Sequence, residues 1–152
     1  PFNLPLIMES TGKSLEEVLD DLACRGGLLG ISGVSGDLRD IQQAAAEGNS
    51  RAQLALDVFT TDIRRYLGSL LVELGGADLI VFTGGIGENQ QQVRTTVCQG
   101  LEELGVQLDE NANVTADGES CISDEGSRTQ VWVIPTNEEL IVARQVCQLL
   151  EG

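Results

Sequence analysis

ADLIVFTGGIGEN, residues 77–89, joins a continuous apolar run to a turn that contains three glycines. The apolar run is typical of a β-strand that is buried on both faces of a parallel sheet. Glycine has no Cβ, so the turn lets the backbone pass close to a ligand, and a helix start beyond it favours phosphate or a polar ring edge. A tight turn between a strand and a helix, capped by Asn89, explains the same residues, so both interpretations stay open.

Strand and helix patterns alternate along the rest of the chain. Strands are predicted over 77–85 and 129–135, and irregular segments over 25–37 and 106–123. Helices are predicted over 13–24, 37–48, 49–75, 88–105 and 136–152. The first and last of them begin with capping boxes, Ser14–Glu17 and Thr136–Glu139. A strand–loop–helix unit occurs twice, which predicts an α/β layered domain.

Composition excludes several classes of protein. The chain has 152 residues, a formal net charge of −15, four cysteines and no histidine. The charge is opposite to that of a nucleic-acid-binding protein. The cysteines are far apart, which argues against a zinc site, and the lack of histidine excludes a thiol protease within this chain. We expect reduced, mostly buried thiols in a cytoplasmic protein, and no apolar stretch is long enough to span a membrane.

Two glycine-containing segments do not match the phosphate-binding motifs that they resemble. STGKS, residues 10–14, has Ile7 where a P-loop needs glycine, so we interpret it as a turn followed by a helix that Ser14 caps. GGIGEN, residues 84–89, has Gln90 where the dinucleotide fingerprint needs its last glycine. Neither segment defines a nucleotide site by itself.

Two further segments place charged residues at the start of a helix. In SGVSGDLRD, residues 32–40, Asp37 suits an N-cap, and the planar guanidinium of Arg39 suits either solvent or the face of a purine. In VIPTNEEL, residues 133–140, the spacing assigns Glu139 to the capping box and leaves Glu138 without a structural role. A carboxylate at that position could hold Mg²⁺ together with phosphate and water.

Taken together and in this order, SGVSGDLRD, VFTGGIGEN and IPTNEEL resemble the carboxy-terminal half of acetate and propionate kinases. The resemblance covers essentially the whole chain and implies the ribonuclease H-like ATPase fold of the actin, sugar kinase and Hsp70 superfamily. It implies that ATP, with Mg²⁺, phosphorylates a short-chain carboxylate, acetate or propionate, to give acyl phosphate and ADP. Butyrate kinase is a related alternative. Members of this family are typically homodimers.

The resemblance also implies roles for the matching residues. The adenosine of ATP or ADP is expected to contact Asp37, Leu38 and Arg39. A second adenosine-contacting loop is expected at Gly85, Ile86, Gly87, Glu88 and Asn89. Glu138 matches a carboxylate that is associated with Mg²⁺. One departure lies within these motifs, since relatives commonly have a serine where this chain has Gly36.

The catalytic groups of the family belong to its amino-terminal half, and none of them matches a residue of this chain. The chain also begins without methionine. We therefore expect residues 1–152 to be a single nucleotide-binding domain of a longer kinase, inactive alone because phosphoryl transfer needs charge neutralisation from several sides. Two alternatives stay open: a non-catalytic nucleotide-sensing domain, and a dimerisation domain built on the apolar stripe of the helix predicted over 49–75.

Overall fold

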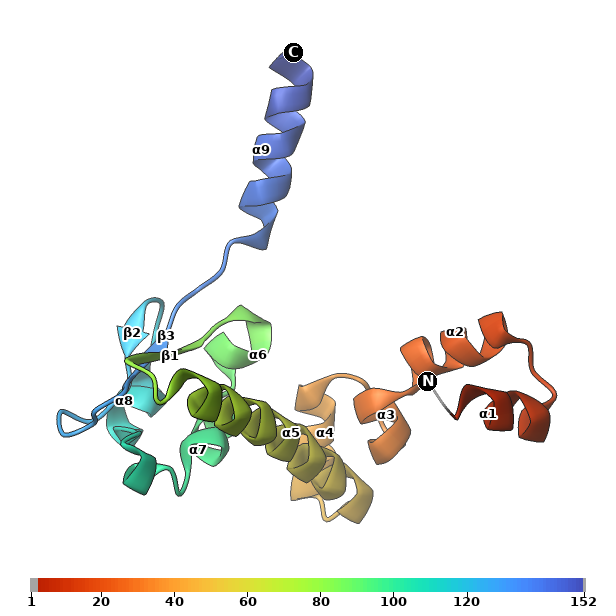
Figure 1. Cartoon of the computed structure of the whole chain (residues 1–152), viewed down its shortest axis with the longest axis horizontal. Coiled ribbons are helices and arrows are strands. Elements are labelled where there is room, and N and C mark those ends of the chain that lie inside the picture. Colours follow the sequence, from red (N-terminus) through yellow and green to blue (C-terminus); the bar gives the residue numbers. More distant parts are fainter. Residues whose placement is uncertain (1–2, 152) are drawn as a thin grey trace. The chain divides into compact units, whose positions relative to one another are not determined.

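The computed structural model describes residues 3–151, without the side chains of Glu138 and Glu151. The chain divides into two units, Pro1–Ile63 and Arg64–Gly152. Within its described residues the first unit is helical, and the second contains a three-stranded sheet (Figure 1). One helix, α5, contributes residues to both units.

The helices of the first unit that precede α5 are connected by short turns. They are α1 (Leu4–Thr11), α2 (Leu15–Arg25), α3 (Gly27–Ser32) and α4 (Leu38–Ala46). Gly12 ends α1 with a left-handed φ of 69°, so STGKS forms a turn between two helices, as predicted. The capping box of α2 is confirmed, because the Ser14 hydroxyl accepts from the Glu17 N–H at 3.3 Å and the Glu17 carboxylate accepts from the Ser14 N–H at 2.8 Å.

The prediction of an irregular segment over 25–37 is wrong, because α3 lies within it. Leu28 and Ile31 of α3 pack against a buried cluster of the same unit around Ile41. Arg51 donates from Nε and Nη2 to two carbonyl groups of α3, both at 3.0 Å. Packing and these carbonyl contacts therefore outweigh the low helix propensity of the glycines in this segment.

The long helix is confirmed as α5 (Ser50–Leu74). Its early residues Ala52 and Ala55 are fully buried in the core of the first unit. Further along, Leu70, Val72 and Leu74 are 58%, 80% and 72% exposed. The apolar stripe therefore belongs to a core only over the first part of the helix.

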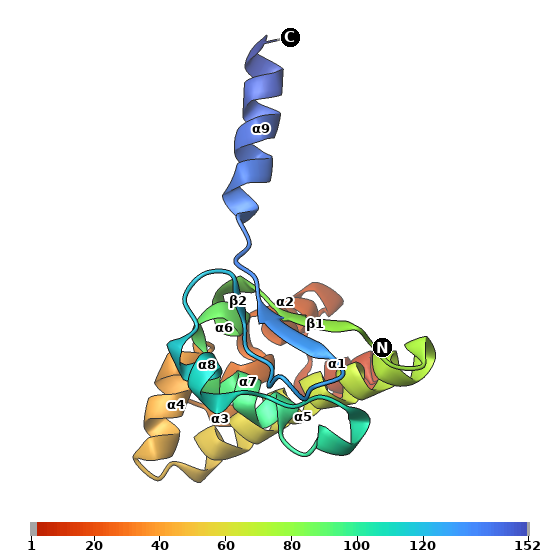
Figure 2. The ribbon, with the colours of Figure 1, turned by 90° about the vertical axis from the view of Figure 1, so that its left-hand side faces the viewer.

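The sheet of the second unit has the strand order β1-β3-β2. Its strands are β1 (Leu79–Phe82), β2 (Ser120–Cys121) and β3 (Gln130–Val133). The two predicted strands, β1 and β3, are adjacent and parallel, with Leu79 opposite Gln130, and β2 is antiparallel to β3 (Figure 2). Each parallel strand is followed by a helix, which confirms the predicted α/β pattern.

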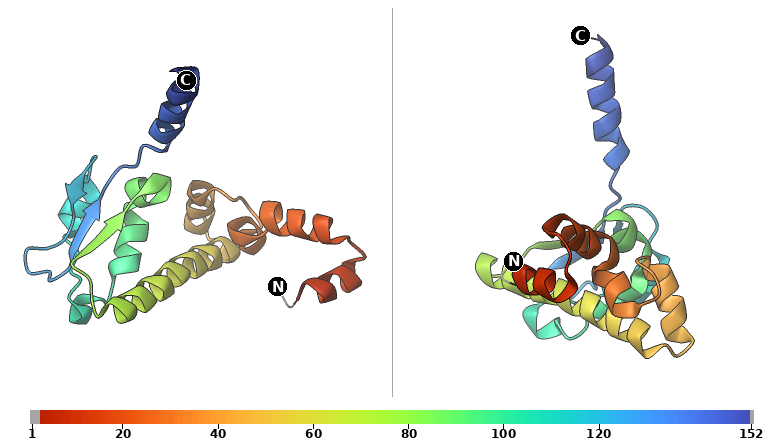
Figure 3. Two further views of the ribbon diagram at one scale, coloured as in Figure 1. Left: turned by 45° about the horizontal axis from the view of Figure 1, so that its top comes forward. Right: turned by 90° about the vertical axis from the view of Figure 1, so that its right-hand side faces the viewer.

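One face of this sheet forms the core of the second unit. Val131 and Val133 are buried there with Cys98 of α7 (Gln91–Cys98), and Ile80 and Phe82 of β1 pack against the same cluster. Figure 3 shows the helices that follow β1, drawn in green, beside the sheet. Alternate residues of a strand point to opposite faces. Leu79 and Val81 are accordingly 47% and 41% exposed on the other face of β1. The prediction that β1 is buried on both faces is therefore wrong within the described residues.

The single helix predicted over 88–105 is replaced by three shorter segments, α6 (Gly84–Asn89), α7 (Gln91–Cys98) and the 3-10 helix η1 (Glu102–Leu104). Gly100 and Gly105 have left-handed φ values of 73° and 87°, which a continuous helix does not accommodate. The segment predicted to be irregular over 106–123 contains the short helix α8 (Glu110–Thr115), which Asp109 caps by accepting from two N–H groups at 2.9 and 3.0 Å.

The cysteines depart from the expectation in their burial. All four are free, but only Cys98 is buried, and burial raises its pKa to about 11. The other three, Cys24, Cys121 and Cys147, are exposed, so the expectation of mostly buried thiols is wrong. Within residues 3–151, no helix has both the length and the apolar character needed to cross a bilayer.

Candidate functional site

The three glycines of the turn after β1 differ in what the structure requires of them. Gly84 has a left-handed φ of 71°, a conformation that other residues adopt only with strain. A Cβ on Gly87 would lie 3.1 Å from the carbonyl carbon of Phe82, which is a tight contact. Gly85 has neither constraint, because its φ is not left-handed and a Cβ there would point into open space. Nothing in the described fold explains why residue 85 is a glycine.

Asn89, at the end of the same turn, makes a local hydrogen bond. Its Nδ2 donates to the Gly85 carbonyl at 2.9 Å, and the Gln90 N–H donates to the Ile86 carbonyl at the same distance. The structural interpretation of Asn89 as the cap of this turn is wrong, because α6 begins after Thr83 and α7 begins after Gln90, and the Asn89 side chain caps neither helix. Ile86, in the same short helix, is 37% exposed.

Glu88 connects the turn to the segment that follows β3. Its carboxylate accepts from the Thr136 N–H at 3.0 Å and from the Thr136 hydroxyl at 3.4 Å. Because β1 and β3 are parallel, both segments lie at the carboxyl ends of the strands. In open α/β sheets, ligands bind at this edge.

A cavity of about 590 Å³ lies at this edge of the sheet. It is lined by Gly84, Gly85, Glu88, Pro135, Thr136, Asn137 and Glu139. The volume is within the usual range for small-molecule sites. The position without a structural explanation, Gly85, is part of its wall.

The capping box predicted for the last helix is wrong. The helix α9 is Glu138–Glu151, and its first turn is capped by Asn137, whose Oδ1 accepts from the Leu140 N–H at 3.0 Å. Thr136 instead bonds to the carboxylate of Glu88. Glu139 therefore has no capping role that distinguishes it from Glu138. The argument that Glu138 alone lacks a structural role, and is thus available to a metal, no longer holds. The side chain of Glu138 lies outside the described residues.

The predicted pair Asp37 and Arg39 lies in the first unit. Asp37 caps α4 by accepting from the Arg39 N–H at 2.9 Å, and its carboxylate also accepts from Nε and Nη2 of Arg39 at 3.1 and 2.6 Å. These hydrogen bonds lower the pKa of Asp37 to about 2. The Arg39 side chain is 78% exposed, so the carboxylate holds the guanidinium while its faces remain open to solvent.

The neighbours of this pair are structural. Leu38 is only 4% exposed, so its side chain belongs to the core of the unit and only its backbone is available to a ligand. The Ser35 hydroxyl accepts from the Asp37 N–H at 3.0 Å and donates to the Asp40 carboxylate at 2.7 Å. Gly36 has no left-handed φ, and a Cβ there would point into open space, so a serine would fit at this position without strain.

Arg94 of α7 and Asn113 of α8 support the turn from outside it, and the sequence analysis did not predict either role. Arg94, in α7, is 2% exposed and donates from Nη1 to the carbonyls of Gly87 and Glu88 at 2.9 and 2.8 Å. Its Nε donates to Asn113 Oδ1 at 2.7 Å. The available signal was an arginine four residues before Cys98, a spacing that places a charge on the apolar face of a helix.

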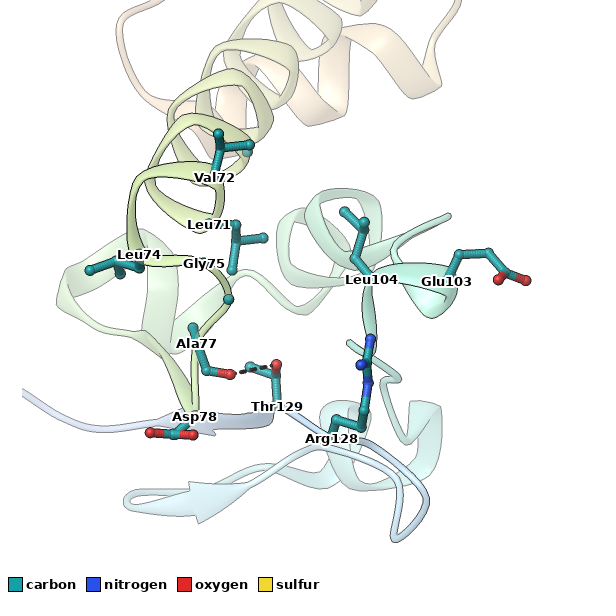
Figure 4. Close-up of a pocket in the computed structure, with 12 residues that line it drawn as sticks. Leu71, Val72, Leu74, Gly75, Ala77, Asp78, Glu103, Leu104, Arg128 and Thr129 are labelled. Atoms are coloured by element: carbon teal, nitrogen blue, oxygen red, sulfur yellow. Dashed lines mark hydrogen bonds between the residues drawn. The ribbon is translucent and has the colours of Figure 1, made fainter.

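A second cavity, of about 600 Å³, lies at the opposite end of β1. Leu71 of α5 and Leu104 of η1 form apolar walls, and Arg128 lies at the edge (Figure 4). The Thr129 hydroxyl donates to the Ala77 carbonyl at 2.7 Å and connects the two segments below it. None of the predicted site residues lines this cavity.

No group of three or more Asp, Glu, Cys or His side chains in the described part of the chain could hold a metal ion. A closed, all-protein metal site is therefore not formed by these residues. Mg²⁺ is commonly bound through one or two carboxylates with phosphate and water as its other ligands. The cavity beside Gly85 offers that kind of donor set, with Glu88, Asn137 and Glu139 in its wall.

Known proteins share both the sequence and this fold. The model of the Acetokinase family matches residues 1–144. Acetate kinase of Geobacillus kaustophilus is 50% identical over 149 residues, which is 98% of this chain and 38% of that protein. The crystal structure of Porphyromonas gingivalis acetate kinase matches with a TM-score of 0.87 and 38% identity, over 99% of this chain and 38% of that one.

A propionate kinase from Francisella tularensis also matches, with a TM-score of 0.83 and 35% identity over 94% of this chain and 36% of that one. These neighbours confirm the fold that the motifs implied, that of acetate and propionate kinases. The chain belongs to the Acetokinase family. It spans about 38% of the length of the curated relatives it matches.

Proposed function

We propose that this chain is the nucleotide-binding part of a kinase that transfers phosphate from ATP to a short-chain carboxylate, acetate or propionate. Family membership and the names of the relatives support the reaction. The activity is a proposal because the chain corresponds to only about 38% of those proteins.

The observation that carries this proposal is Gly85. Of the three glycines in the turn, it is the one whose conformation and surroundings would accept a side chain. It also lines the cavity at the carboxyl ends of the parallel strands. A ligand ring packed directly on the backbone would explain why a side chain is absent there.

The remaining predicted residues divide into groups with different tasks. The turn offers three kinds of contact to adenosine. These are the backbone of Gly85 and Gly87, the exposed apolar side chain of Ile86, and the side-chain amide of Asn89. Glu88 acts by holding the turn, since Thr136 already occupies its carboxylate. In the first unit, Arg39 offers its guanidinium face to the base, while Asp37 fixes that guanidinium and Leu38 contributes through its backbone.

Mg²⁺ fits the oxygen donors at the end of β3, and when bound it would neutralise charge on the phosphates of the nucleotide. We propose Glu138 as the carboxylate associated with it, on the resemblance to the family motif. Glu139 is the competing candidate, because it lines the cavity beside Gly85.

Binding and orientation of the nucleotide are the tasks of this chain's own residues, and none of them is proposed as catalytic. We therefore expect no acyl phosphate from the purified chain supplied with ATP, Mg²⁺ and acetate. Measurable formation of acetyl phosphate by the purified chain would contradict this part of the proposal.

Homodimer formation is a second role that a specific observation favours. Tyr66, Leu70 and Leu74 recur every fourth residue on one face at the end of α5, and all three are more than half exposed. An apolar surface of this kind is typical of an interface. Sedimentation at several concentrations tests it, and a constant monomer mass would contradict it.

The free thiols support a reducing compartment, and we propose the cytoplasm.

The nucleotide proposal is tested by comparing two substitutions of helical glycines by alanine. Gly85 and Gly68 both have open space at Cβ and no left-handed φ. Calorimetric titration with MgADP should show at least about tenfold weaker binding for Gly85→Ala, the loss expected when one close contact is blocked. Gly68→Ala should bind like the parent. Equal affinity in all three chains would contradict an adenosine contact at Gly85.

A further inference from the structure

Arg94 is a buried charge that the proposed function does not use. The residue is 2% exposed, and no carboxylate in the described part of the chain forms an ion pair with it. Burial lowers the pKa of this group from its usual value, but arginine stays protonated in proteins. A buried charge without a counterion is costly, so its hydrogen bonds must compensate for the lost water.

All the hydrogen bonds of the guanidinium go to uncharged oxygens. Nη1 donates to the carbonyls of Gly87 and Glu88 at 2.9 and 2.8 Å. On the other side, Nε and Nη2 donate to the side-chain and main-chain oxygens of Asn113, at 2.7 and 2.8 Å. Arg94 therefore connects the end of the glycine turn to α8.

These contacts give partners to two of the last carbonyl groups of α6. A helix leaves its last carbonyl groups without partners inside the helix. Asn89 Nδ2 donates to the carbonyl of Gly85, and the Gln90 N–H donates to that of Ile86. Arg94 donates to the next two carbonyls, those of Gly87 and Glu88. A positive charge at the carboxyl end of a helix is also favourable electrostatically.

Asn113 is fixed in turn by the helix that carries Arg94. It is 1% exposed, and its Nδ2 donates to the Gln91 carbonyl at 3.2 Å and to the Thr95 hydroxyl at 2.9 Å. The acceptor for Arg94 is thus held in one orientation by two further contacts. Arg94, Asn113 and Thr95 therefore form one hydrogen-bonded group, which contacts the end of the turn through Arg94.

We propose that Arg94 is a positioning residue, which holds the turn over Gly84–Asn89 in the shape that presents Gly85 to a nucleotide. The identity of the ligand rests on the proposed function, whereas the role of Arg94 in holding the turn does not. Lysine cannot replace the arginine, because a single ammonium group cannot reach acceptors on two sides as the planar fork does.

The test measures amide hydrogen exchange of the whole chain without nucleotide. The reporter is the Gln90 N–H, which closes the turn, and the reference is the Ile122 N–H, which bonds to β3 at 2.7 Å. Arg94→Lys and Arg94→Met should speed exchange at Gln90 by about tenfold or more relative to Ile122, since hydrogen bonds to a charged group are strong. The control Arg128→Met removes an exposed arginine and should change neither amide.

A second variant pair guards against loss of folding. Asn113→Ala removes one acceptor of Arg94 and should loosen the turn in the same way, but less. Asn113→Asp keeps that acceptor but loses the Nδ2 hydrogen bonds to Gln91 and Thr95, so it should speed exchange less than Asn113→Ala. Unchanged exchange at Gln90, or equal acceleration at Gln90 and Ile122 in every variant, would overturn the inference.

MgADP affinity separates this inference from the function on which it rests. If the parent binds MgADP, Arg94→Lys should bind about tenfold or more weakly at a temperature where it is fully folded. Equal affinity would overturn the positioning role. Absence of binding in the parent would instead contradict the proposed function, and the exchange experiment would then decide alone whether Arg94 clamps the turn.

Discussion

The Glu88 carboxylate accepts a hydrogen bond from the Thr136 N–H at 3.0 Å, and this bond connects the turn after β1 to the segment after β3. The two residues are 48 positions apart in the sequence. The connection keeps two strand-end segments together at the edge of the sheet where the candidate nucleotide cavity lies.

Replacement of Glu88 should reveal this connection. Glu88→Gln keeps an acceptor oxygen and should leave the free energy of unfolding nearly unchanged. Glu88→Ala should lower it by about 0.5–1.5 kcal/mol, the usual contribution of a hydrogen bond. Urea unfolding measures both. A loss of stability in Glu88→Gln as large as in Glu88→Ala would show that the negative charge, and not the bond to Thr136, is what matters.

The glycines of the turn should respond differently to alanine. Gly84→Ala forces a left-handed φ on a residue with a Cβ and should lower the free energy of unfolding by about 1–2 kcal/mol. Gly85→Ala meets open space inside a helix and should raise it by about 0.5–1 kcal/mol. Thermal unfolding of the two variants beside the parent checks the pair. Destabilisation by Gly85→Ala would mean that the fold itself requires that glycine.

The pair of Asp37 and Arg39 predicts a pH dependence of stability. Hydrogen bonds from Arg39 hold the pKa of Asp37 at about 2 in the folded chain, below its value of about 3.9 in an unfolded chain. The contribution of the carboxylate is therefore complete above about pH 4 and is lost as the pH falls toward 2.

Asp37→Asn keeps an N-cap oxygen but removes this charge. The difference in the free energy of unfolding between parent and variant should be constant from neutral pH down to about pH 4 and should narrow below it. Urea unfolding across this range measures the difference, and an NMR titration of the Asp37 carboxyl gives its midpoint. A midpoint near 4 would contradict the bidentate pairing.

Arg64 supports the helix that carries Arg94. Its Nη1 lies 3.0, 2.7 and 2.6 Å from the carbonyl oxygens of Thr96, Val97 and Gln99, at the end of α7. Arg64→Met should leave these carbonyls without a donor and lower the free energy of unfolding by about 1–3 kcal/mol. Arg128→Met is the matched exposed control. Equal stability of both variants would show that water replaces the donor at the end of α7.

Features that depend on neighbouring residues were predictable from the sequence. The capping box of Ser14 and Glu17 and the register of apolar residues in α5 each follow from a local rule, and both are present. The parallel pairing of β1 and β3 follows from the repeated strand–helix unit.

Features that depend on distant contacts were not predictable. The helix α3 forms because Arg51 and a buried cluster hold a glycine-rich segment. The cap of α9 is Asn137 and not Thr136, because Thr136 has a partner from the other strand end. Arg94 resembles an ordinary helix residue until its carbonyl partners are known.

The central claim is that this chain binds adenosine nucleotide, and thermal unfolding with and without MgADP tests it most directly. At about a hundredfold excess over the dissociation constant, MgADP should add about 2.7 kcal/mol to the stability of the folded chain. At the same MgADP concentration the tenfold weaker binding expected for Gly85→Ala should reduce this gain to about 1.4 kcal/mol or less. Arg39→Ala should also reduce it, whereas Gly68→Ala should keep it. Cooperative unfolding of the parent at the same temperature with and without saturating MgADP would contradict the claim.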